Sequence, residues 1–374
     1  MEQSIAGRGS TYKVFMITVV IVLALATGAM AGYTITDLGL GGTSSQGYGI
    51  NNSGQVTGAA STAGDSASHA FLYSLGTGTQ DLGSLSGTDS VGYGINSTGQ
   101  VTGAAWIAGD ISHAFLYSSA TGMKDLGTLG GSYSWGYGIN STGLVTGYAD
   151  TVGNNTNHAF LYSTGTGMQD LGTLGGSDSQ GYGINNSGQV TGTASTAGDS
   201  ASHAFLYSSG TGMKDIGTLG GPISVGLGIN NSRQVTGYAW TAGDISHAFI
   251  YSAGTGMKDL GTLGGSESWG YGINSIGQVT GYALTVGNAA SHAFLYSAGT
   301  GMVDLNTLLS PSSGWTLENA TGINDLGQIT GYGVLNGQEQ AFLMTPDAFP
   351  TPIPPAVYLF GSGLAGLVGL KRKH

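Results

Sequence analysis

The sequence predicts an all-β fold, a seven-bladed β-propeller of four-stranded blades whose ring is closed by the N-terminal strand. Three observations lead to this prediction. A unit of about 45 residues recurs about seven times, each unit contains four short stretches typical of strands, and the first and last units are incomplete in complementary ways. An open β-solenoid is the alternative, because stacked repeats of that kind also produce a fixed period.

The repeat is marked by a Gly-Ile-Asn triplet. Its isoleucine falls at Ile50, Ile95, Ile139, Ile184, Ile229, Ile273 and Ile323. The steps between these residues are 45, 44, 45, 45, 44 and 50, a period typical of stacked supersecondary units. A second period lies above the first, since residues 181–208 match residues 47–74 except for Thr193 against Ala59. Near-identical units spread the same side chains over the molecule, which argues against one specialised catalytic site.

One unit, residues 181–221, shows how the strands are predicted. They are expected at 181–185, 189–194, 203–208 and 213–219. Asn-Ser-Gly at 186–188 and Gly-Thr-Gly at 210–212 are expected to form the hairpin turns, because Asn and Gly tolerate the positive φ that tight turns need. Gly220 and Gly221 are expected to link to the next unit. The glycines of the Gly-x-Gly-Ile-Asn motif would let blades approach closely near the axis.

The two ends of the repeat region complement each other. The stretch YTITDLGLGG, from Tyr33, matches the fourth strand of a unit, whereas the last unit contains only the first three strands. Asp37 occupies the position of the aspartate in six later fourth strands, at Asp81, Asp125, Asp170, Asp215, Asp259 and Asp304. Pairing the N-terminal strand with the last unit would close the ring and remove two exposed sheet edges.

The composition fits a turn-dense β protein outside the cell. Hydrophobic residues make up 40% of the chain and charged residues 8%, and 71 residues are Gly. Between the predicted signal peptide and the basic C-terminal tail lie four cations and nineteen acids, a net charge of −15. This charge disfavours binding of nucleic acid. The chain has no Cys, so packing has to supply its stability, and we expect no cofactor.

Residues 1–31 have the organisation of a signal peptide. Arg8 and Lys13 lie before or at the start of an apolar run at 14–26, and Ala29-Met30-Ala31 has the small-x-small pattern that signal peptidase reads. We expect cleavage after Ala31 and export of the repeats. The alternative is an uncleaved membrane anchor, although the run is short against the roughly 20 residues that a spanning helix needs.

A His-Ala-Phe triplet recurs together with Gly-x-Gly-Ile-Asn-x-x-Gly-Gln-Val-Thr-Gly and Asp-Leu-Gly-Thr-Leu-Gly-Gly. Its histidines are His69, His113, His158, His203, His247 and His292. In these motifs residues 33–345 resemble the bacterial extracellular repeat family named HAF after this triplet. The seventh copy departs from the pattern with Gln340 in place of His. The resemblance implies an exported repeat protein at 32–347 and brings no enzymatic activity with it.

The C-terminal segment, residues 348–374, resembles a PEP-CTERM sorting signal. It joins Pro352-Ile353-Pro354 to a short apolar stretch at 356–370 and a basic tail at 371–373. The motif departs from the family pattern at Ile353, where that pattern has Glu. The resemblance implies processing by an exosortase-type sorting machinery, with the segment in the membrane before processing. A plain C-terminal membrane anchor is the alternative, since a stop-transfer segment also ends in cations.

Two kinds of polar residue could suggest metal binding. Six equivalent histidines on successive blades are unlikely to meet at one ion, so we interpret His203 and its equivalents as residues that hydrogen bond into a turn, with the fourth-strand Asp as a candidate partner. Loops with Gly-Asp at 64–65, 109–110, 198–199 and 243–244 offer one acid each, and two other units have Asn154 and Asn288 there. A turn is the favoured reading over Ca²⁺ binding.

Four tryptophans are the candidate ligand contacts. Trp106 and Trp240 stand where other units have Ser, Asp or Leu, and Trp135 and Trp269 where others have Gln or Val. Packing therefore does not require Trp at these positions, whereas exposed aromatic rings suit stacking on sugars. Packing at the blade edge is the alternative.

These features predict a cell-surface or extracellular-matrix repeat protein, a non-enzymatic binding or structural module associated with exopolysaccharide or with surface proteins. No catalytic residues are assigned. A propeller hydrolase or lyase acting on exopolysaccharide is the alternative, and a cleft with two carboxylates about 5 to 10 Å apart would favour it. A purely structural spacer in the envelope is a third hypothesis.

Overall fold

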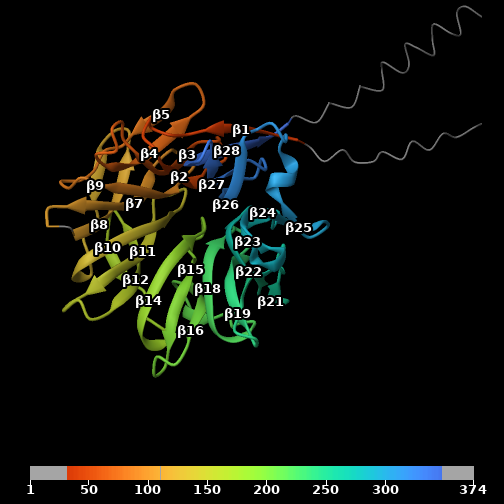
Figure 1. The fold of residues 1–374 in the computed structure, drawn as a ribbon. Coiled ribbons are helices and arrows are strands. Elements are labelled where there is room, and N and C mark those ends of the chain that lie inside the picture. Colours follow the sequence, from red (N-terminus) through yellow and green to blue (C-terminus); the bar gives the residue numbers. More distant parts are fainter. Residues whose placement is uncertain (1–31, 110, 348–374) are drawn as a thin grey trace, which may run out of the picture. The chain divides into compact units, whose positions relative to one another are not determined.

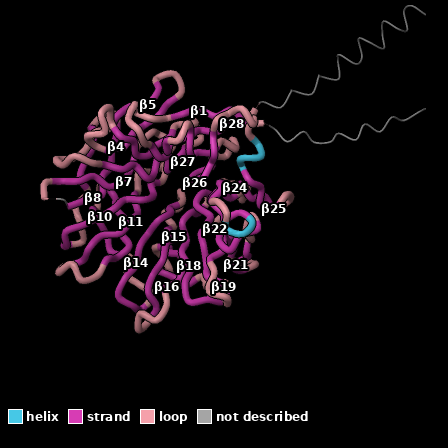
Figure 2. Tube along the Cα trace, in the orientation of Figure 1, coloured by secondary structure: helices cyan, strands magenta, loops and turns pink. Residues whose placement is uncertain are grey.

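The computed structural model describes residues 32–109 and 111–347, which form an all-β structure with two short 3-10 helices (Figures 1 and 2). The predicted signal peptide, with Ala29 and Ala31, and the predicted sorting segment, with Pro352, Ile353 and Pro354, lie outside the described residues. Within the described part, no helix has the length and apolar character needed to cross a membrane.

The strands form sets of four antiparallel strands. The first set contains β2 (Ser45–Ile50), β3 (Val56–Ser61), β4 (Ser68–Ser74) and β5 (Gly78–Asp81). The second contains β6 (Ser90–Ile95), β7 (Val101–Ile107), β8 (Ile111–Ser118) and β9 (Gly122–Asp125). The third contains β10 (Gly130–Ile139), β11 (Val145–Thr151), β12 (Asn157–Ser163) and β13 (Gly167–Asp170).

The next three sets follow the same order. The fourth contains β14 (Gly175–Ile184), β15 (Val190–Thr196), β16 (Ser202–Ser208) and β17 (Gly212–Asp215). The fifth contains β18 (Gly220–Ile229), β19 (Val235–Thr241), β20 (Ser246–Ser252) and β21 (Gly256–Asp259). One parallel pair, Ser202 with Ile223, joins these two sets into an eight-stranded sheet. The sixth contains β22 (Gly264–Ile273), β23 (Val279–Thr285), β24 (Ser291–Ser297) and β25 (Gly301–Asp304), with η1 (Val286–Asn288) and η2 (Leu305–Leu308) beside it.

The seventh set draws its strands from both ends of the described chain. It contains β26 (Trp315–Ile323), β27 (Ile329–Leu335), β28 (Gln338–Pro346) and β1 (Tyr33–Asp37). β1 pairs antiparallel with β28, from Tyr33 opposite Pro346 to Asp37 opposite Phe342. The N-terminal strand therefore supplies the fourth strand of the last repeat, and the two strands lie side by side in Figure 1.

The boundaries of two strands differ from those that the sequence predicts. In the unit at 181–221 the first strand begins earlier, at Gly175, because Gly175 pairs with Thr196 across an irregularity in register. Likewise Gly220 and Gly221, predicted as a link, are the first residues of β18. The fourth strand ends early, at Asp215, because the Asp215 carboxylate accepts a hydrogen bond from the Gly217 N–H and turns the chain.

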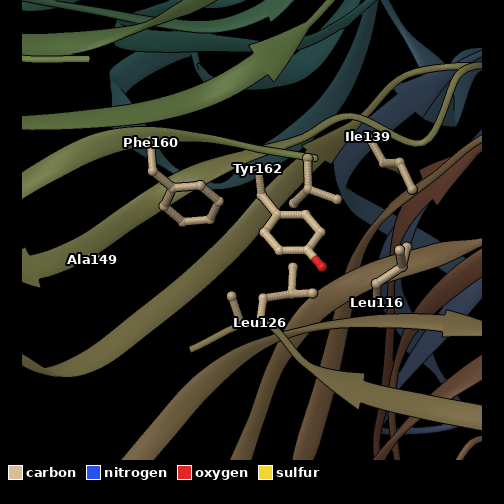
Figure 3. Packing of buried hydrophobic residues seen from close by; sticks show 8 residues of the cluster. Leu116, Leu126, Ile139, Ala149, Phe160 and Tyr162 are labelled. Carbon is tan, nitrogen blue, oxygen red and sulfur yellow. The ribbon is translucent and has the colours of Figure 1, made fainter. Parts of the chain in front are cut away.

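The hydrophobic core consists of layers between neighbouring sets. Seven phenylalanines, one per set, are fully buried: Phe71, Phe115, Phe160, Phe205, Phe249, Phe294 and Phe342. Figure 3 shows one layer, in which Leu116 and Leu126 of the second set pack against Ile139, Phe160 and Tyr162 of the third. A corresponding layer joins the last set to the first. There Leu38, Ala341 and Leu343 pack against Val56 and Phe71.

Neighbouring sets are also joined by a buried serine. The Ser90 hydroxyl, at the start of β6, accepts a hydrogen bond from the Ala70 N–H of β4 at 2.8 Å and donates to the Gly83 carbonyl. The same donor and acceptor positions recur, and the Ala341 N–H donates to the Ser45 hydroxyl at 2.9 Å. These bonds satisfy backbone groups that the layer between the sets removes from water.

The asparagines of the Gly-Ile-Asn triplets form a closed cycle of hydrogen bonds. The Asn51 side-chain amide donates to the Asn96 carbonyl at 2.9 Å. The relation repeats from each set to the next, through Asn96, Asn140, Asn185, Asn230, Asn274 and Asn324. The last bond returns from Asn324 to the Asn51 carbonyl at 3.0 Å. The first strands are in contact in the same cyclic order, β26 with β2 included.

The second glycine of each Gly-x-Gly motif permits this approach, as the sequence predicts. A Cβ on Gly49 would lie 2.8 Å from the Tyr93 carbonyl oxygen, and one on Gly94 would lie 2.6 Å from the Tyr137 carbonyl oxygen. Distances under 3 Å to backbone atoms leave no room for a side chain. The first strands can therefore lie close together only with Gly at these positions.

We expect Asn185→Ala to lower the free energy of unfolding by at least about 2 kcal/mol. Asn185 is 3% exposed, its amide donates to the Gln189 side chain and the Asn230 carbonyl, and its oxygen accepts from the Ser187 and Gln189 N–H groups. Urea unfolding measures the effect. Asn186→Ser is the matched control, because Asn186 is exposed and Ser97 and Ser141 hold the equivalent position. Equal unfolding midpoints for the two variants would contradict the role of the cycle.

Candidate functional site

Three cavities follow one another along the first strands of the sets. The first, of about 260 Å³, is lined mainly by tyrosines. The second, of about 190 Å³, is lined by glycine and isoleucine from all seven sets, from Gly49 and Ile50 to Gly322 and Ile323. The third, also about 190 Å³, is lined by isoleucines and the asparagine turns. The three cavities thus run along the first strands from an aromatic end to an asparagine end.

We call the first space the tyrosine cavity. It is lined by Tyr48, Tyr93, Tyr137, Tyr182, Leu227, Tyr271, Thr321 and Tyr332. The first seven of these residues are the x of the Gly-x-Gly motif or its equivalent, one from each set, and Tyr332 comes from β27. The sequence carried a signal for this cavity, since Tyr recurs in five units at a position between two glycines. Sequence analysis missed the cavity because it considered only the glycines there.

Four of these tyrosines form a continuous arc. The centroids of the Tyr48 and Tyr93 rings are 5.2 Å apart, those of Tyr93 and Tyr137 are 4.7 Å apart, and those of Tyr137 and Tyr182 are 5.0 Å apart. These separations are within the favourable range for aromatic pairs. The arc is a pre-formed aromatic wall along one side of the cavity.

The phenol groups around the cavity stay neutral. Burial raises the pKa of Tyr48, Tyr93, Tyr137, Tyr182 and Tyr271 far above the usual value. Burial also raises the pKa of Tyr282 to about 12, helped by the negative charge of Glu267. For Tyr332, burial is again the main cause, and the carboxylates of Glu339 and Glu318 add to it. Neutral phenols can donate and accept hydrogen bonds, so the cavity suits an uncharged polar ligand.

Two glutamines hold tyrosine hydroxyls at the cavity. The Tyr48 hydroxyl donates to the Gln46 side-chain oxygen, and the Gln46 amide in turn donates to the Glu339 carboxylate at 2.8 Å. The Tyr182 hydroxyl donates to the Gln180 side-chain oxygen in the same way. Glutamine two residues before tyrosine therefore fixes the direction of the phenol group.

Trp135 and Trp106, two of the predicted contacts, lie in one aromatic cluster. The Trp135 ring stacks against Tyr137 and Tyr148 with centroids 6.3 and 6.2 Å away, and Trp106 meets it edge-on at 6.0 Å. The Trp135 indole N–H donates to the Ser112 hydroxyl at 2.7 Å. We call this group, with Tyr93, the Trp135 cluster. Tyr93 and Tyr137 also line the tyrosine cavity, so the cluster continues its wall outward.

Trp269 forms a second cluster. Its ring stacks on Tyr238 with centroids 3.9 Å apart and lies 5.6 Å from Tyr282 and 6.5 Å from Tyr271, and its indole N–H donates to the Ser246 hydroxyl at 2.9 Å. These residues are the Trp269 cluster. Trp240, the fourth predicted contact, is half-buried and makes no ring contact with another aromatic side chain of the described residues. The structure thus places Trp135 and Trp269 against tyrosines and Trp106 against Trp135, all three partly buried.

The histidines lie near the start of the third strands and contact the fourth-strand aspartates, as expected. The Nδ1 atom of His203 lies 2.7 Å from the Asp215 carboxylate of the fourth strand. The same contact recurs at His69, His113, His158, His247 and His292. In the seventh set Gln340 instead accepts a hydrogen bond from the Ser45 hydroxyl at 2.8 Å. Each histidine therefore ties the third strand of its set to the fourth.

The Gly-Asp loops also have a structural role. Asp199 adopts a positive φ of 54°, and its carboxylate accepts a hydrogen bond from the Ser177 N–H at 2.7 Å. Asn154 adopts a φ of 56° and accepts from the Ser132 N–H at 2.8 Å. Asp and Asn thus accept equivalent hydrogen bonds in these loops, which supports the turn interpretation. Within the described residues no group of three or more His, Asp or Glu gathers where it could hold a metal ion.

No protein-family model and no curated protein matches the sequence. Solved structures do match. An oligogalacturonate lyase in complex with manganese is 13% identical, with a TM-score of 0.55, and the match covers 85% of this chain and 97% of the lyase. TolB from Acinetobacter baumannii is 10% identical, with a TM-score of 0.46, over 66% of this chain and 62% of TolB. A puromycin hydrolase mutant is 12% identical, with a TM-score of 0.46, over 88% of this chain and 58% of the hydrolase.

These similarities concern the fold. This chain spans about three fifths of TolB and of the hydrolase, and nearly the whole lyase. The sheets of four antiparallel strands and the similarity in fold to the lyase agree with the all-β class that the sequence predicts. At such low identity no site residue carries over from any of these proteins.

We expect the cavity tyrosines to ionise only at very alkaline pH. Free tyrosine has a pKa near 10. Burial raises the pKa of Tyr48, which lines the cavity, far above this value, and raises the pKa of Tyr282, next to the cavity residue Tyr271, to about 12. Because the pKa values are raised on folding, their contribution to stability is present below about pH 10 and is lost as the pH rises toward the folded-state values. An ultraviolet titration of the native protein should show a late phase that disappears in denaturant. A single native transition near pH 10 would contradict the burial of these hydroxyls.

Proposed function

We propose that this chain is a seven-bladed β-propeller, its ring closed by β1, and that it is an exported, non-enzymatic module that binds polysaccharide at the cell surface or in the extracellular matrix. The architecture is supported by the seven sets of strands, by the cycle of asparagines that returns from Asn324 to Asn51, and by the pairing of β1 with β28. The similarity in fold to the lyase, at a TM-score of 0.55, also supports it.

One observation carries the binding proposal. The Trp135 cluster is centred on the third set and the Trp269 cluster on the sixth. Each cluster shares at least one tyrosine with the tyrosine cavity. Aromatic rings with a polar edge present both an apolar face and a hydrogen-bonding group, which is what a sugar ring offers in return. Because Trp135 and Trp269 are separated by the second period of the sequence, the two clusters suit a ligand that repeats along its length.

The proposed localisation rests on the two terminal segments. The signal-peptide pattern at 1–31 supports export, and the PEP-CTERM-like segment at 348–374 supports handling by an exosortase-type machinery. Between them, the net charge of −15 suits a soluble surface outside the cell and disfavours nucleic acid as a partner. A polysaccharide without strong negative charge is the partner that suits both the aromatic clusters and the negative net charge of the chain.

The binding proposal predicts that replacing the central tryptophans weakens polysaccharide binding. Trp135→Gln and Trp269→Val introduce residues that other sets carry at the same position, at Gln180 and Val225, so the fold accepts them. We expect each variant to lose about tenfold in affinity for a neutral exopolysaccharide, and the double variant more. Affinity electrophoresis with the full-length protein measures the loss.

Two controls sharpen this test. Lys124→Ala changes a cation that contacts Tyr162 and should leave affinity unchanged. Reducing ends released from the polysaccharide are measured in the same samples, because hydrolysis or elimination would favour an enzyme over a binding module. Full affinity in the double tryptophan variant would contradict the proposed binding surface.

Closure of the ring is tested by a cross-link between its ends. Thr34 and Thr345 are direct partners in the pairing of β1 with β28. The native chain has no cysteine that could compete with a pair introduced at these two positions. Direct antiparallel partners lie at a separation that a disulfide can span. We expect oxidised Thr34→Cys/Thr345→Cys to be monomeric and more stable than its reduced form by about 3 kcal/mol, since the bond closes a very long loop. A disulfide-linked dimer would show that β1 pairs with another molecule and would contradict closure.

A further inference from the structure

The seventh set breaks the pattern of the tyrosine cavity. Five sets place Tyr at the x of Gly-x-Gly and the fifth set places Leu227 there, but the seventh places Thr321. The Thr321 hydroxyl donates to the Gly47 carbonyl at 2.7 Å, so the small side chain is turned to the backbone. The cavity is therefore wider at the seventh set than it would be with a seventh aromatic ring.

The same set leaves a hydrogen-bond acceptor without a partner. Asn319 occupies the position of Gln46 and Gln180, as shown by its pairing opposite Tyr332. In the first and fourth sets the glutamine oxygen accepts from the tyrosine two residues later. Thr321 cannot reproduce that bond, and among the described residues the buried Asn319 oxygen has no hydrogen-bond partner. The seventh set therefore lacks the bond from tyrosine to amide oxygen that the first and fourth sets make.

Two carboxylates lie near the cavity at the seventh set, outside its lining. The Glu339 carboxylate accepts from the Gln46 amide at 2.8 Å, and the Gln46 oxygen accepts from the Tyr48 hydroxyl. Glu339 and Glu318 also raise the pKa of the Tyr332 hydroxyl, which lines the cavity. The lining itself consists of tyrosines with Leu227 and Thr321, so it offers aromatic faces and phenol hydroxyls.

We propose that the tyrosine cavity binds one uncharged sugar ring at the end of a polysaccharide chain. This inference rests on the proposed binding function and names the site and the chemical class of its ligand. The C–H face of the sugar packs on the tyrosine arc, and its hydroxyls bond to the phenol groups that line the cavity, Tyr332 among them. A volume of about 260 Å³ is just below the roughly 300 Å³ at which small-molecule sites begin, so one ring fits and an oligosaccharide does not.

The charges select against acidic sugars. Glu339 and Glu318 lie near Tyr332 but outside the lining, and no Lys, Arg or His lines the cavity. A uronic acid or a phosphorylated sugar would bring its negative charge toward these carboxylates, in a place where burial weakens screening. The ligand is therefore a neutral sugar, with hydroxyls as its polar groups.

The test fills the cavity with a residue that the fold already uses. Thr321→Tyr places in the seventh set the side chain that five other sets carry, and Thr321→Ser is the control, because serine keeps a hydroxyl for the Gly47 carbonyl and leaves the cavity open. The probes are a panel of neutral hexoses, the matching uronic acids and a neutral exopolysaccharide, titrated calorimetrically into full-length protein. We expect Thr321→Tyr to weaken binding of the hexose and of the polysaccharide by about tenfold or more, and Thr321→Ser to bind like the native protein.

A second variant keeps the test valid if Thr321→Tyr does not fold. Tyr182→Leu removes one ring of the arc and introduces the residue found at Leu227, and it should weaken hexose binding while the urea midpoint stays near the native one.

Three results would overturn the inference. Polysaccharide binding that is unaffected by Thr321→Tyr and Tyr182→Leu, with loss only in the tryptophan variants, would leave the binding module in place and remove the cavity from it. Uronic acids bound as well as hexoses would refute the selection for a neutral ring. A native protein that binds no polysaccharide at all would refute the proposed function and this inference together.

Discussion

The arrangement of the sets depends on one side chain, the asparagine that follows each first strand. Its oxygen holds the hairpin turn of its own set, and its amide reaches the backbone of the next set, as Asn185 does with Ser187 and with Asn230. One residue thus couples the local turn to the contact between sets. The buried serines at the start of the first strands, such as Ser90, do the same at the other end of the interface. Between these two polar contacts lies the layer of phenylalanines, so most interfaces are fixed at both ends and filled in the middle, whereas Leu317 replaces the serine at the interface of the sixth and seventh sets.

The residues that build the interfaces between sets differ from the residues that vary around the proposed binding site. The positions that build the interfaces, among them the phenylalanines and the Gly-Ile-Asn triplets, are nearly the same in every set. The positions that vary face the aromatic end of the first and second strands, where Gln46, Trp135 and Asn319 are equivalents. The first strands thus carry different side chains at this position while the residues that fill the interfaces stay the same.

Much of the fold could be read from the sequence, and the site only in part. The period, the four strands per unit and the contact between His203 and Asp215 follow from motifs whose chemistry is local. The early start of β14 does not, because Gly175 enters the strand only through its pairing with Thr196. The tryptophans were visible as exceptions to the repeat, but their stacking on tyrosines depends on which side of a glycine-rich strand each residue faces. Irregular register, as between Gly181 and Gly183, removes the simple alternation that would have shown this.

The pairing of β1 with β28 joins residues as far apart as Thr34 and Thr345, a sequence separation of 311. Contacts of such range form slowly, because a long loop has to close before they contribute any stability. During that time the edge of β28 is an unpaired template, and β1 of a second molecule presents the same complementary strand. Assembly into the monomer therefore competes with strand exchange between molecules, and dilution sets the balance between the two. For this chain, the concentration at which it folds is as much a determinant of the final molecule as its sequence.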